Sequence, residues 1–308
     1  MSRVGPGARR AILVLLLLAG LTLAVLSLGD QWGEVRAGAG QLSSGWVALA
    51  GVLSVLSLVA SLLGWRSMLA GLGTPLPLAT AARIYFLGQL GKYVPGSVWP
   101  VLAQMELGAG YGLSRAAVGA ASLLALAIAI PVALVLALLA VPALLSADAS
   151  AYLLLFLVLP VAVVMLSPPV LNPLLTRAVA LARRPPLPQR LGAGTIGRVA
   201  GWSVAMHVAL GLQTYVLARD LGAEGALLLP LAIGAFSLAS MAGLIALPVP
   251  AGAGVREAVL VVTLAPVLPV GQALLLALVS RALLTASDLC VAGIVARGTR
   301  PRSSSQEV

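Results

Sequence analysis

The sequence predicts an all-α, polytopic membrane protein of about eight transmembrane helices. Of its 308 residues, 60% are hydrophobic and only 9% are charged, and the mean hydropathy is +1.08. Apolar runs of about 18 or more residues recur along the chain, and each is long enough to cross a hydrocarbon core of about 30 Å. These runs are continuous, whereas the strands of a β-barrel would alternate apolar and polar residues over short segments.

The first apolar run is interpreted as a retained helix because the following "SLGDQWGEV" lacks a small-x-small signal cleavage site. Tryptophans stand near both ends of the second run, as expected for anchors at the membrane interface. Continuous spans are expected over roughly residues 11–28, 46–65, 116–141, 152–171, 199–218, 226–247 and 272–296.

The charge distribution predicts the orientation of these spans. The net charge is +10, and the connection from Asn172 to Arg198 carries five arginines and no acid. Cytoplasmic loops of membrane proteins collect Lys and Arg. Alternating crossings of the cell membrane therefore place both termini in the cytoplasm. Nucleic-acid binding is disfavoured because no basic run is interleaved with stacking aromatics. Arginine outnumbers lysine eighteen to one, which hints at a bacterial source.

One membrane domain is expected over residues 1–297, with a disordered cytoplasmic tail at 298–308. Its halves, about 1–171 and 172–297, each contain a helix break: "GKYVPGSVWP" (Gly91–Pro100) and "PVPAGAGVREA" (Pro248–Ala258). Proline and glycine break helices, and freed backbone groups are tolerated at membrane depth only beside protein or a water-filled cavity. The residues expected to make the breaks are Gly91, Pro95, Gly96, Pro100, Pro248, Pro250, Gly252 and Gly254.

Short helical pieces flank these breaks, over Leu78 to Leu90 before the first and near Val255 to Leu268 after the second. Paired interruptions of this kind in two halves indicate a transporter's substrate site made of broken or re-entrant segments. Helix ends at such breaks expose amides that suit an anionic group.

Ionisable residues gather around the breaks, and at membrane depth they need a cavity or a partner. Arg281 and Asp288 lie seven residues apart on the last span, about 10 Å along one face. The candidate substrate-binding residues are Arg83, Lys92, Tyr93, Trp99, Glu106, Arg256, Glu257, Arg281 and Asp288.

Structural alternatives stay open for several of these residues. Lys92 and Arg256 would snorkel to the headgroups if their loops lay at the cytoplasmic surface. Arg281 and Asp288 would form a structural contact with each other, or each would pair elsewhere. His207 is expected to be a hydrogen-bonded interior residue. Tyr93 and Trp99 would serve equally as interfacial aromatics.

Several kinds of chemistry lack their sequence signature. A single cysteine, Cys290, and a single histidine exclude a disulfide framework and a Cys/His metal site. The sequence has no Walker-type loop, no G-x-S-x-G elbow and no HExxH helix. No metal, no cofactor and no catalytic residue is expected.

At the breaks the sequence resembles the flippase-like transmembrane region of lysylphosphatidylglycerol synthases and its stand-alone relatives. The matching stretches are "RIYFLGQLGKYVPGSVWP" (Arg83–Pro100), "LPVPAGAGVREAVL" (Leu247–Leu260) and "SRALLTASDL" (Ser280–Leu289). The resemblance implies a lipid-translocating membrane protein without the soluble aminoacyl-transferase domain of the synthases. It departs at "AGAGVRE", where relatives often have more glycines, and at Asp288, where a proline or apolar residue is common.

The sequence therefore favours a lipid flippase-like transporter for an anionic or aminoacylated phospholipid, or for a polyprenyl-phosphate-linked lipid. Arg83, Lys92, Arg256 and Arg281 are expected to bind phosphate, with Glu106 and Glu257 holding these cations in place or contacting a cationic headgroup. One alternative is a membrane-embedded transferase that acts on polyprenyl-phosphate donors, with Glu106 or Glu257 as base. Another is a non-catalytic scaffold for envelope lipid-modifying enzymes.

Overall fold

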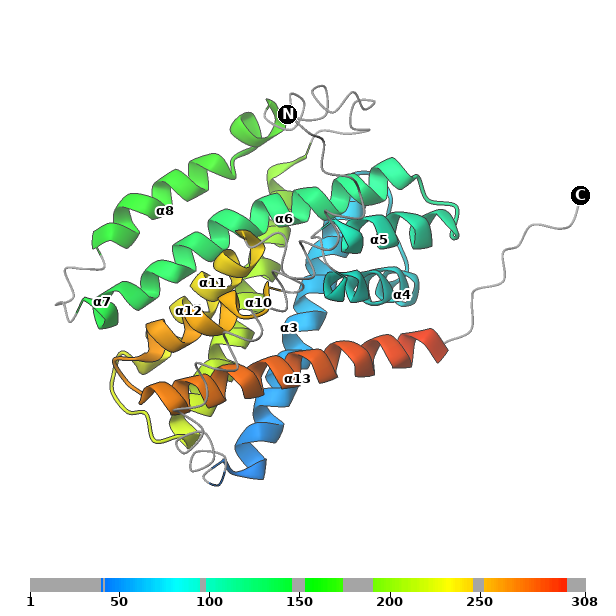
Figure 1. Ribbon diagram of the computed structural model, residues 1–308. Coiled ribbons are helices and arrows are strands. Elements are labelled where there is room, and N and C mark those ends of the chain that lie inside the picture. Colours follow the sequence, from blue (N-terminus) through cyan, green and yellow to red (C-terminus); the bar gives the residue numbers. More distant parts are fainter. Residues whose placement is uncertain are drawn as a thin grey trace, which may run out of the picture.

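A computed structural model of the chain describes residue 40 and residues 42–94, 98–145, 153–173, 191–245 and 252–297. Within these ranges the regular secondary structure is helical, which confirms the predicted all-α class (Figure 1). Four helical segments of the described chain are long and apolar enough to cross a membrane: Ser44–Gly71, Arg115–Leu144, Leu228–Ile245 and Val270–Arg297.

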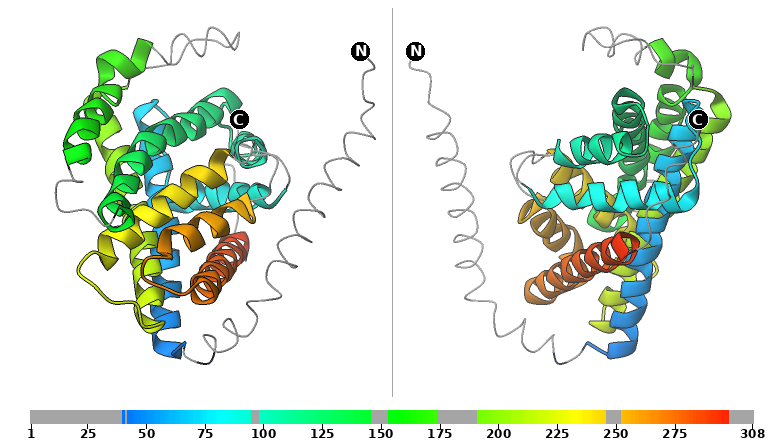
Figure 2. Two further views of the ribbon diagram at one scale, coloured as in Figure 1. Left: turned by 60° about the vertical axis from the view of Figure 1, so that its left-hand side comes forward. Right: turned by 90° about the vertical axis from the view of Figure 1, so that its right-hand side faces the viewer.

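Helices α3 (Ser44–Gly71) and α10 (Ala193–Asp220) form the central pair of the fold (Figures 1 and 2). They run antiparallel, since the start of α3 meets the end of α10. There the Asp220 carboxylate accepts hydrogen bonds from the Ser43 amide at 2.8 Å and from the Ser43 hydroxyl at 2.6 Å. At the other end, a Cβ on Gly71 would lie within 3.0 Å of three Thr195 side-chain atoms, so the helices approach closely.

The first predicted break forms a helical hairpin. Helix α4 (Leu78–Gln89) continues into a short 3-10 turn, η2 (Leu90–Tyr93), and α5 (Trp99–Ala109) returns beside it. The two helices pack closely where Gly88 meets Gln104 and where Gly91 meets the backbone of Trp99 and Pro100. The segment Leu78 to Leu90 is thus helical as predicted, and the chain reverses direction after it.

The second break forms a similar hairpin between α11 (Leu228–Ile245) and α12 (Val255–Leu264). Gly252 has φ +66° and Gly254 has φ +81°, in the half of the backbone map that favours glycine. A Cβ on Gly252 would stand 2.7 Å from the Gly243 Cα, so this approach also requires glycine. Figure 1 shows the α4–α5 hairpin on the right of α3 and the α11–α12 hairpin on its left.

The remaining named helices pack around this centre. Helix α13 (Val270–Arg297) crosses in front of α3 in Figure 1 and packs against α3, α4 and α12. On the opposite side, α6 (Arg115–Ala137) packs on α3, α10 and α11. A 3-10 turn, η3 (Leu138–Ala140), and the short helix α7 (Val141–Leu144) extend α6. Helix α8 (Leu153–Met165) lies against α6.

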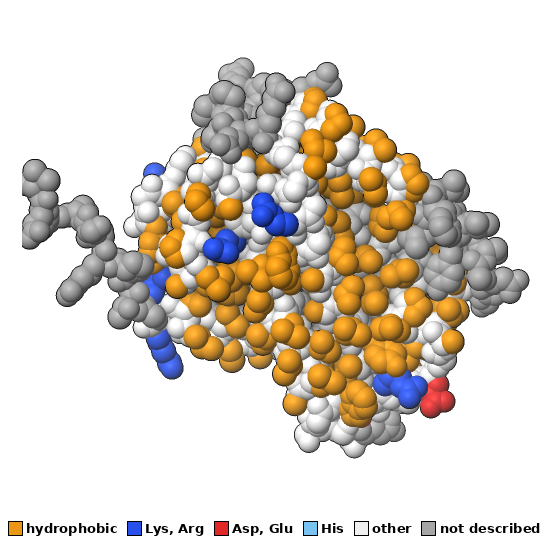
Figure 3. Space-filling model, turned by 180° about the vertical axis from the view of Figure 1, so that it is seen from behind, with side chains coloured by type: hydrophobic (Ala, Val, Ile, Leu, Met, Phe, Trp, Pro, Cys, Tyr) orange, Lys and Arg blue, Asp and Glu red, His pale blue; other side chains and the backbone are white. Residues whose placement is uncertain are grey.

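The outer surface is largely apolar. Figure 3 shows hydrophobic side chains over most of the described part of the face opposite to Figure 1, with a few Lys and Arg side chains among them. Val262 on α12, for example, is 71% exposed and Ile294 on α13 is 70% exposed. Exposed apolar surface of this extent is what lipid-facing helices require.

The expected spans 46–65, 116–141, 226–247 and 272–296 coincide with the four long apolar helices. A helix also stands at the expected fifth position, 199–218, although α10 is not among those four. The expected span 152–171 contains α8, which has 13 residues. The first expected span, at 11–28, lies outside the described residues, as do the basic residues 177–190 and the tail.

Candidate functional site

The two hairpins and α13 bring charged side chains together in the interior. Arg281 and Asp288 stand two turns apart on α13 and, of the two alternatives, each pairs elsewhere. The Asp288 carboxylate, 4% exposed, lies 2.5 Å from the Lys92 ammonium of the first hairpin. Its Oδ2 also accepts a hydrogen bond from the Tyr93 hydroxyl at 2.7 Å. Asp288 thus ties α13 to the tip of the α4–α5 hairpin.

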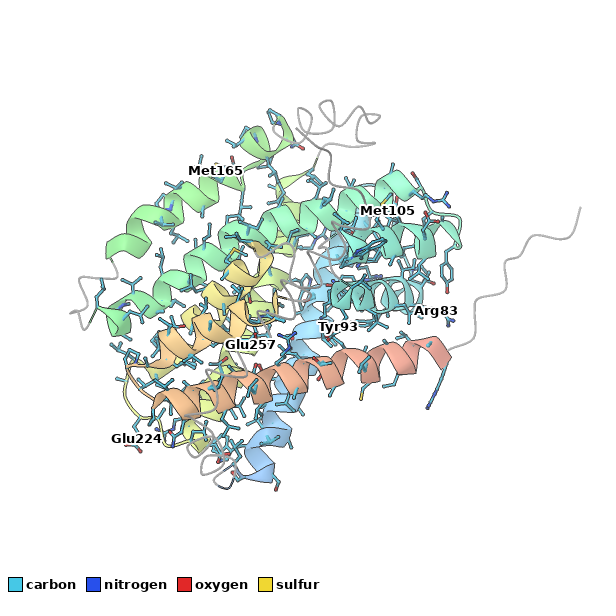
Figure 4. The ribbon with its side chains drawn as sticks, in the orientation of Figure 1. Arg83, Tyr93, Met105, Met165, Glu224 and Glu257 are labelled. Carbon is cyan, nitrogen blue, oxygen red and sulfur yellow. The ribbon has the colours of Figure 1, made fainter. Side chains whose placement is uncertain are left out.

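Arg281 ties the same helix to the second hairpin. Its Nη1 donates to Glu257 Oε1 at 2.6 Å, and the other carboxylate oxygen, Oε2, accepts the Gly254 amide at 2.5 Å. Glu257 therefore caps the first turn of α12 and pairs with α13 at the same time. Figure 4 shows Tyr93 and Glu257 in the middle of the molecule, with Glu224 at its margin.

Arg256 is the remaining cation of this group, and it is held differently. Its guanidinium lies 4.9 Å from the centroid of the buried Phe236 ring, and its Nη2 donates to the Ser240 hydroxyl at 3.1 Å. Its Nε is buried without a hydrogen-bond partner, and no carboxylate of the described residues forms an ion pair with it.

These five side chains carry three positive charges, on Lys92, Arg256 and Arg281, and two negative charges, on Glu257 and Asp288. We refer to them as the charge cluster. Its net charge is therefore +1, and Arg256 carries the charge that no carboxylate balances. A part-buried guanidinium in this condition favours an anionic ligand, because its planar donors suit a phosphate or carboxylate.

Two cavities meet at the charge cluster. The smaller has a volume of about 190 Å³ and is lined by all five charged residues together with Tyr93. The larger, of about 420 Å³, is lined mainly by small and apolar side chains of α3, α6 and α10 and by residues of both hairpins. Six residues line both: Ser61, Tyr85, Gln89, Lys92, Met206 and Arg256. A charged chamber thus adjoins a more apolar one, and these six residues lie between them.

A buried hydrogen-bond network lies beside the smaller cavity, which its member Ser280 lines. The Gln213 amide group donates to the Ser54 hydroxyl at 2.6 Å, and its carbonyl oxygen accepts from the Ser280 hydroxyl at 2.9 Å. The three residues come from α10, α3 and α13, and all are at most 1% exposed. The network fixes the central pair against the helix that carries Arg281 and Asp288.

His207 on α10 is 2% exposed, and its Nδ1 lies 2.9 Å from the Ser203 carbonyl oxygen. It is therefore the hydrogen-bonded interior residue that the sequence predicts.

Three predicted site residues lie away from the cavities. Arg83 donates to the Val295 carbonyl oxygen near the end of α13, and Figure 4 places it far from Glu257. Glu106 forms an exposed, two-bond pair with Arg115 at 2.9 and 2.8 Å. Trp99 begins α5 and is 45% exposed.

Some of the predicted break residues line a cavity, and others lie outside the described residues. Pro100 and Gly252 line the larger cavity, whereas Pro95, Gly96, Pro248 and Pro250 lie outside the described residues.

The sequence reasoning did not single out several polar lining residues. Ser57 and Ser61 interrupt an apolar helix one turn apart, and this spacing was the available signal for a polar face on α3. The polar lining residues that were missed are Ser57, Ser61, Tyr85, Gln89, Gln104, Ser122, Ser203, Ser240, Ser280 and Thr285.

Apolar spans, an apolar outer surface and an interior charge cluster define a multi-pass integral membrane protein. The chain belongs to the lysylphosphatidylglycerol synthase TM region family, whose model matches residues 11–292. This match confirms the resemblance seen in the three sequence stretches around the breaks. No curated protein matches the chain.

Proposed function

We propose that the protein is a lipid flippase-like transporter that moves a lipid with an anionic headgroup between the leaflets of a cell membrane. The headgroup would be that of an anionic or aminoacylated phospholipid, or of a polyprenyl-phosphate-linked lipid. In this proposal the chain crosses the membrane about eight times, with both termini in the cytoplasm, and the two hairpins are re-entrant segments.

The observation that carries the proposal is the unbalanced guanidinium of Arg256 inside the charge cluster. Its Nε has no partner, and it lines both cavities. An anionic headgroup bound there would neutralise the net charge of +1 and supply the missing acceptor. The larger cavity would receive the apolar part of the same lipid, which explains why a polar and an apolar chamber share a wall.

The order of the elements supports the two pseudo-repeated halves. A long helix, a hairpin and a second long helix follow one another as α3, α4–α5 and α6, and again as α10, α11–α12 and α13. The hairpin tips contribute Lys92 from one half and Arg256 with Glu257 from the other. A site between the repeats allows the two hairpins to move against the central α3–α10 pair during alternating access.

The transferase alternative needs Glu106 or Glu257 as a base. Both carboxylates already accept hydrogen bonds from an arginine, Arg115 for Glu106 and Arg281 for Glu257, and Glu106 lies on the exposed α5–α6 corner. These contacts occupy the oxygens that a substrate proton would need. The contacts therefore support the transporter over the transferase.

The decisive experiment uses the purified full-length protein in liposomes that contain fluorescently labelled phosphatidylglycerol, with a membrane-impermeant quencher added outside. Wild type is expected to expose inner-leaflet label to the quencher. Arg256→Ala is expected to reduce this rate to that of protein-free liposomes, because the unbalanced cation is gone.

Arg115→Gln is the matched control, since it removes an exposed arginine that lines neither cavity. It is expected to retain the wild-type rate. Transport by Arg256→Ala at the wild-type rate would overturn the assignment of the site. Product formation from a polyprenyl-phosphate donor in detergent, where no leaflets exist, would favour the transferase instead.

A further inference from the structure

Ser203 on α10 has a buried hydroxyl without a partner. The residue is 8% exposed and lines the larger cavity, and its Oγ has no hydrogen-bond partner within the described part of the chain. Serine hydroxyls inside membrane helices commonly donate to the carbonyl four residues earlier. Ser54, Ser61 and Ser237 do so here, to Ala50, Ser57 and Ile233. Ser203 differs from them, because its hydroxyl makes no hydrogen bond within its own helix.

The larger cavity, which Ser203 lines, has a mostly small or apolar wall, and its polar residues Gln104 and Ser122 bond to each other. The wall includes the small or apolar residues Ala60, Gly64, Ala125, Leu126, Ala129 and Trp202. A hydroxyl confined in such surroundings loses its hydrogen bond to water and gains nothing in exchange. A ligand with one acceptor at this depth and hydrocarbon beyond it would remove that cost.

The outer end of the larger cavity reaches the surface of the molecule. Leu126 of α6 is 39% exposed and Trp202 of α10 is 36% exposed, and both line the cavity. The volume of about 420 Å³ falls within the range of about 300–1,000 Å³ that is usual for ligand pockets. The cavity thus offers a cation at Arg256, an unpartnered hydroxyl at Ser203 and an apolar exit.

We propose that the larger cavity holds the ester end and one acyl chain of a diacyl glycerophospholipid, with the Ser203 hydroxyl donating to an ester carbonyl. This inference rests on the proposed function and names the lipid class. The phosphate lies at Arg256, and rotation about χ1 turns the Ser203 hydroxyl among its three staggered positions, towards the ligand. A polyprenyl phosphate has hydrocarbon directly after its phosphate ester oxygen and supplies no carbonyl for Ser203. The lipid is therefore an ester-linked glycerophospholipid.

The test is a competition between two forms of phosphatidylglycerol with chains of equal length, one linked through esters and one through ethers. The ether form lacks both carbonyls and has a different mass, so native mass spectrometry reads the bound ratio from one equimolar mixture. Wild type is expected to retain the diester by roughly three- to tenfold over the diether, the worth of one net hydrogen bond. Ser203→Ala is expected to bring this ratio close to one.

Ser237→Ala is the control, because it removes a buried hydroxyl that bonds within its own helix and lines neither cavity. It is expected to keep the wild-type ratio. Equal retention of both lipids by wild type would overturn this inference alone, as would a diester preference that survives in Ser203→Ala. Retention of neither lipid by wild type would overturn the inference together with the proposed function.

Discussion

The Lys92 ammonium and the Asp288 carboxylate lie 2.5 Å apart across the junction between the first hairpin and the last helix, 196 positions later in the sequence. With Asp288 only 4% exposed, its carboxylate has too little water around it to replace Lys92. The pair therefore acts both as a structural tie and as part of the charge cluster, and substitutions separate these roles.

Asp288→Asn keeps an acceptor for the Tyr93 hydroxyl but leaves Lys92 without its counter-charge. We expect it to lower the free energy of unfolding by about 3 kcal/mol. This value is at the low end of the cost of breaking a buried ion pair, because Lys92 is a third exposed. Thermal unfolding of the detergent-purified protein measures the loss. Adding Lys92→Met should restore most of the stability but not lipid transport, and a double variant as unstable as Asp288→Asn would contradict this account.

Glu257→Gln and Glu257→Ala should differ, since the carboxylate has two partners. Both remove the charge that Arg281 pairs with, but the Gln side chain still has an oxygen for the Gly254 amide. The Ala variant should be less stable than the Gln variant by about 1 kcal/mol, the usual worth of a helix cap. Hydrogen exchange over residues 254–258 should be faster in Ala than in Gln, and identical exchange in both would argue against the cap.

Gln213→Leu is expected to destabilise the protein although it preserves the volume of the side chain. It leaves the fully buried Ser280 hydroxyl without its acceptor, at a cost of about 1–3 kcal/mol. Ser280→Ala in the same chain removes the orphaned group and should recover much of the loss. The melting temperatures of wild type, both single variants and the double variant make up a double-mutant cycle. Strict additivity of the two stability changes would show that Gln213 and Ser280 are not coupled.

Gly234→Ala tests the contact between α11 and η3. An added Cβ would stand 2.4 Å from the Ala140 amide nitrogen and 2.7 Å from its Cβ, and backbone atoms cannot yield as a flexible side chain would. A loss of about 1–3 kcal/mol is expected. Gly201→Ala is the matched control within a helix, with no other atom within 4 Å of its added Cβ, and it should be neutral or slightly stabilising. A stable Gly234→Ala would mean that the helices separate more readily than their packing suggests.

The long apolar helices were predictable because hydropathy over one helix length is a local property, and residues 46–65 and 272–296 illustrate this. The charge cluster was predictable in part, because Lys92, Arg256, Glu257, Arg281 and Asp288 are costly at membrane depth wherever they occur. Their pairing was not. Whether Arg281 meets Asp288 or Glu257 depends on how the second hairpin folds back, which residue spacing on α13 does not encode.

Arg83 and Glu106 illustrate the other limit of sequence reasoning. Both are charged and near the first break, but the reversal of the chain between α4 and α5 carries them away from the tip and towards the outer ends of the hairpin. Ser203 was missed for a different reason. A single serine in an apolar helix is ordinary, and only the absence of its usual backbone partner distinguishes it.

The close antiparallel contact of α3 and α10 offers a fixed reference for measuring motion. The Asp220 carboxylate joins the two helix ends through two hydrogen bonds from Ser43, so a pair of spectroscopic labels near that end should report a constant distance throughout a transport cycle. The chain has one cysteine, the exposed Cys290, and Cys290→Ser provides a cysteine-free background for placing labels. Labels on the two hairpins would then report how far each tip moves relative to the α3–α10 pair.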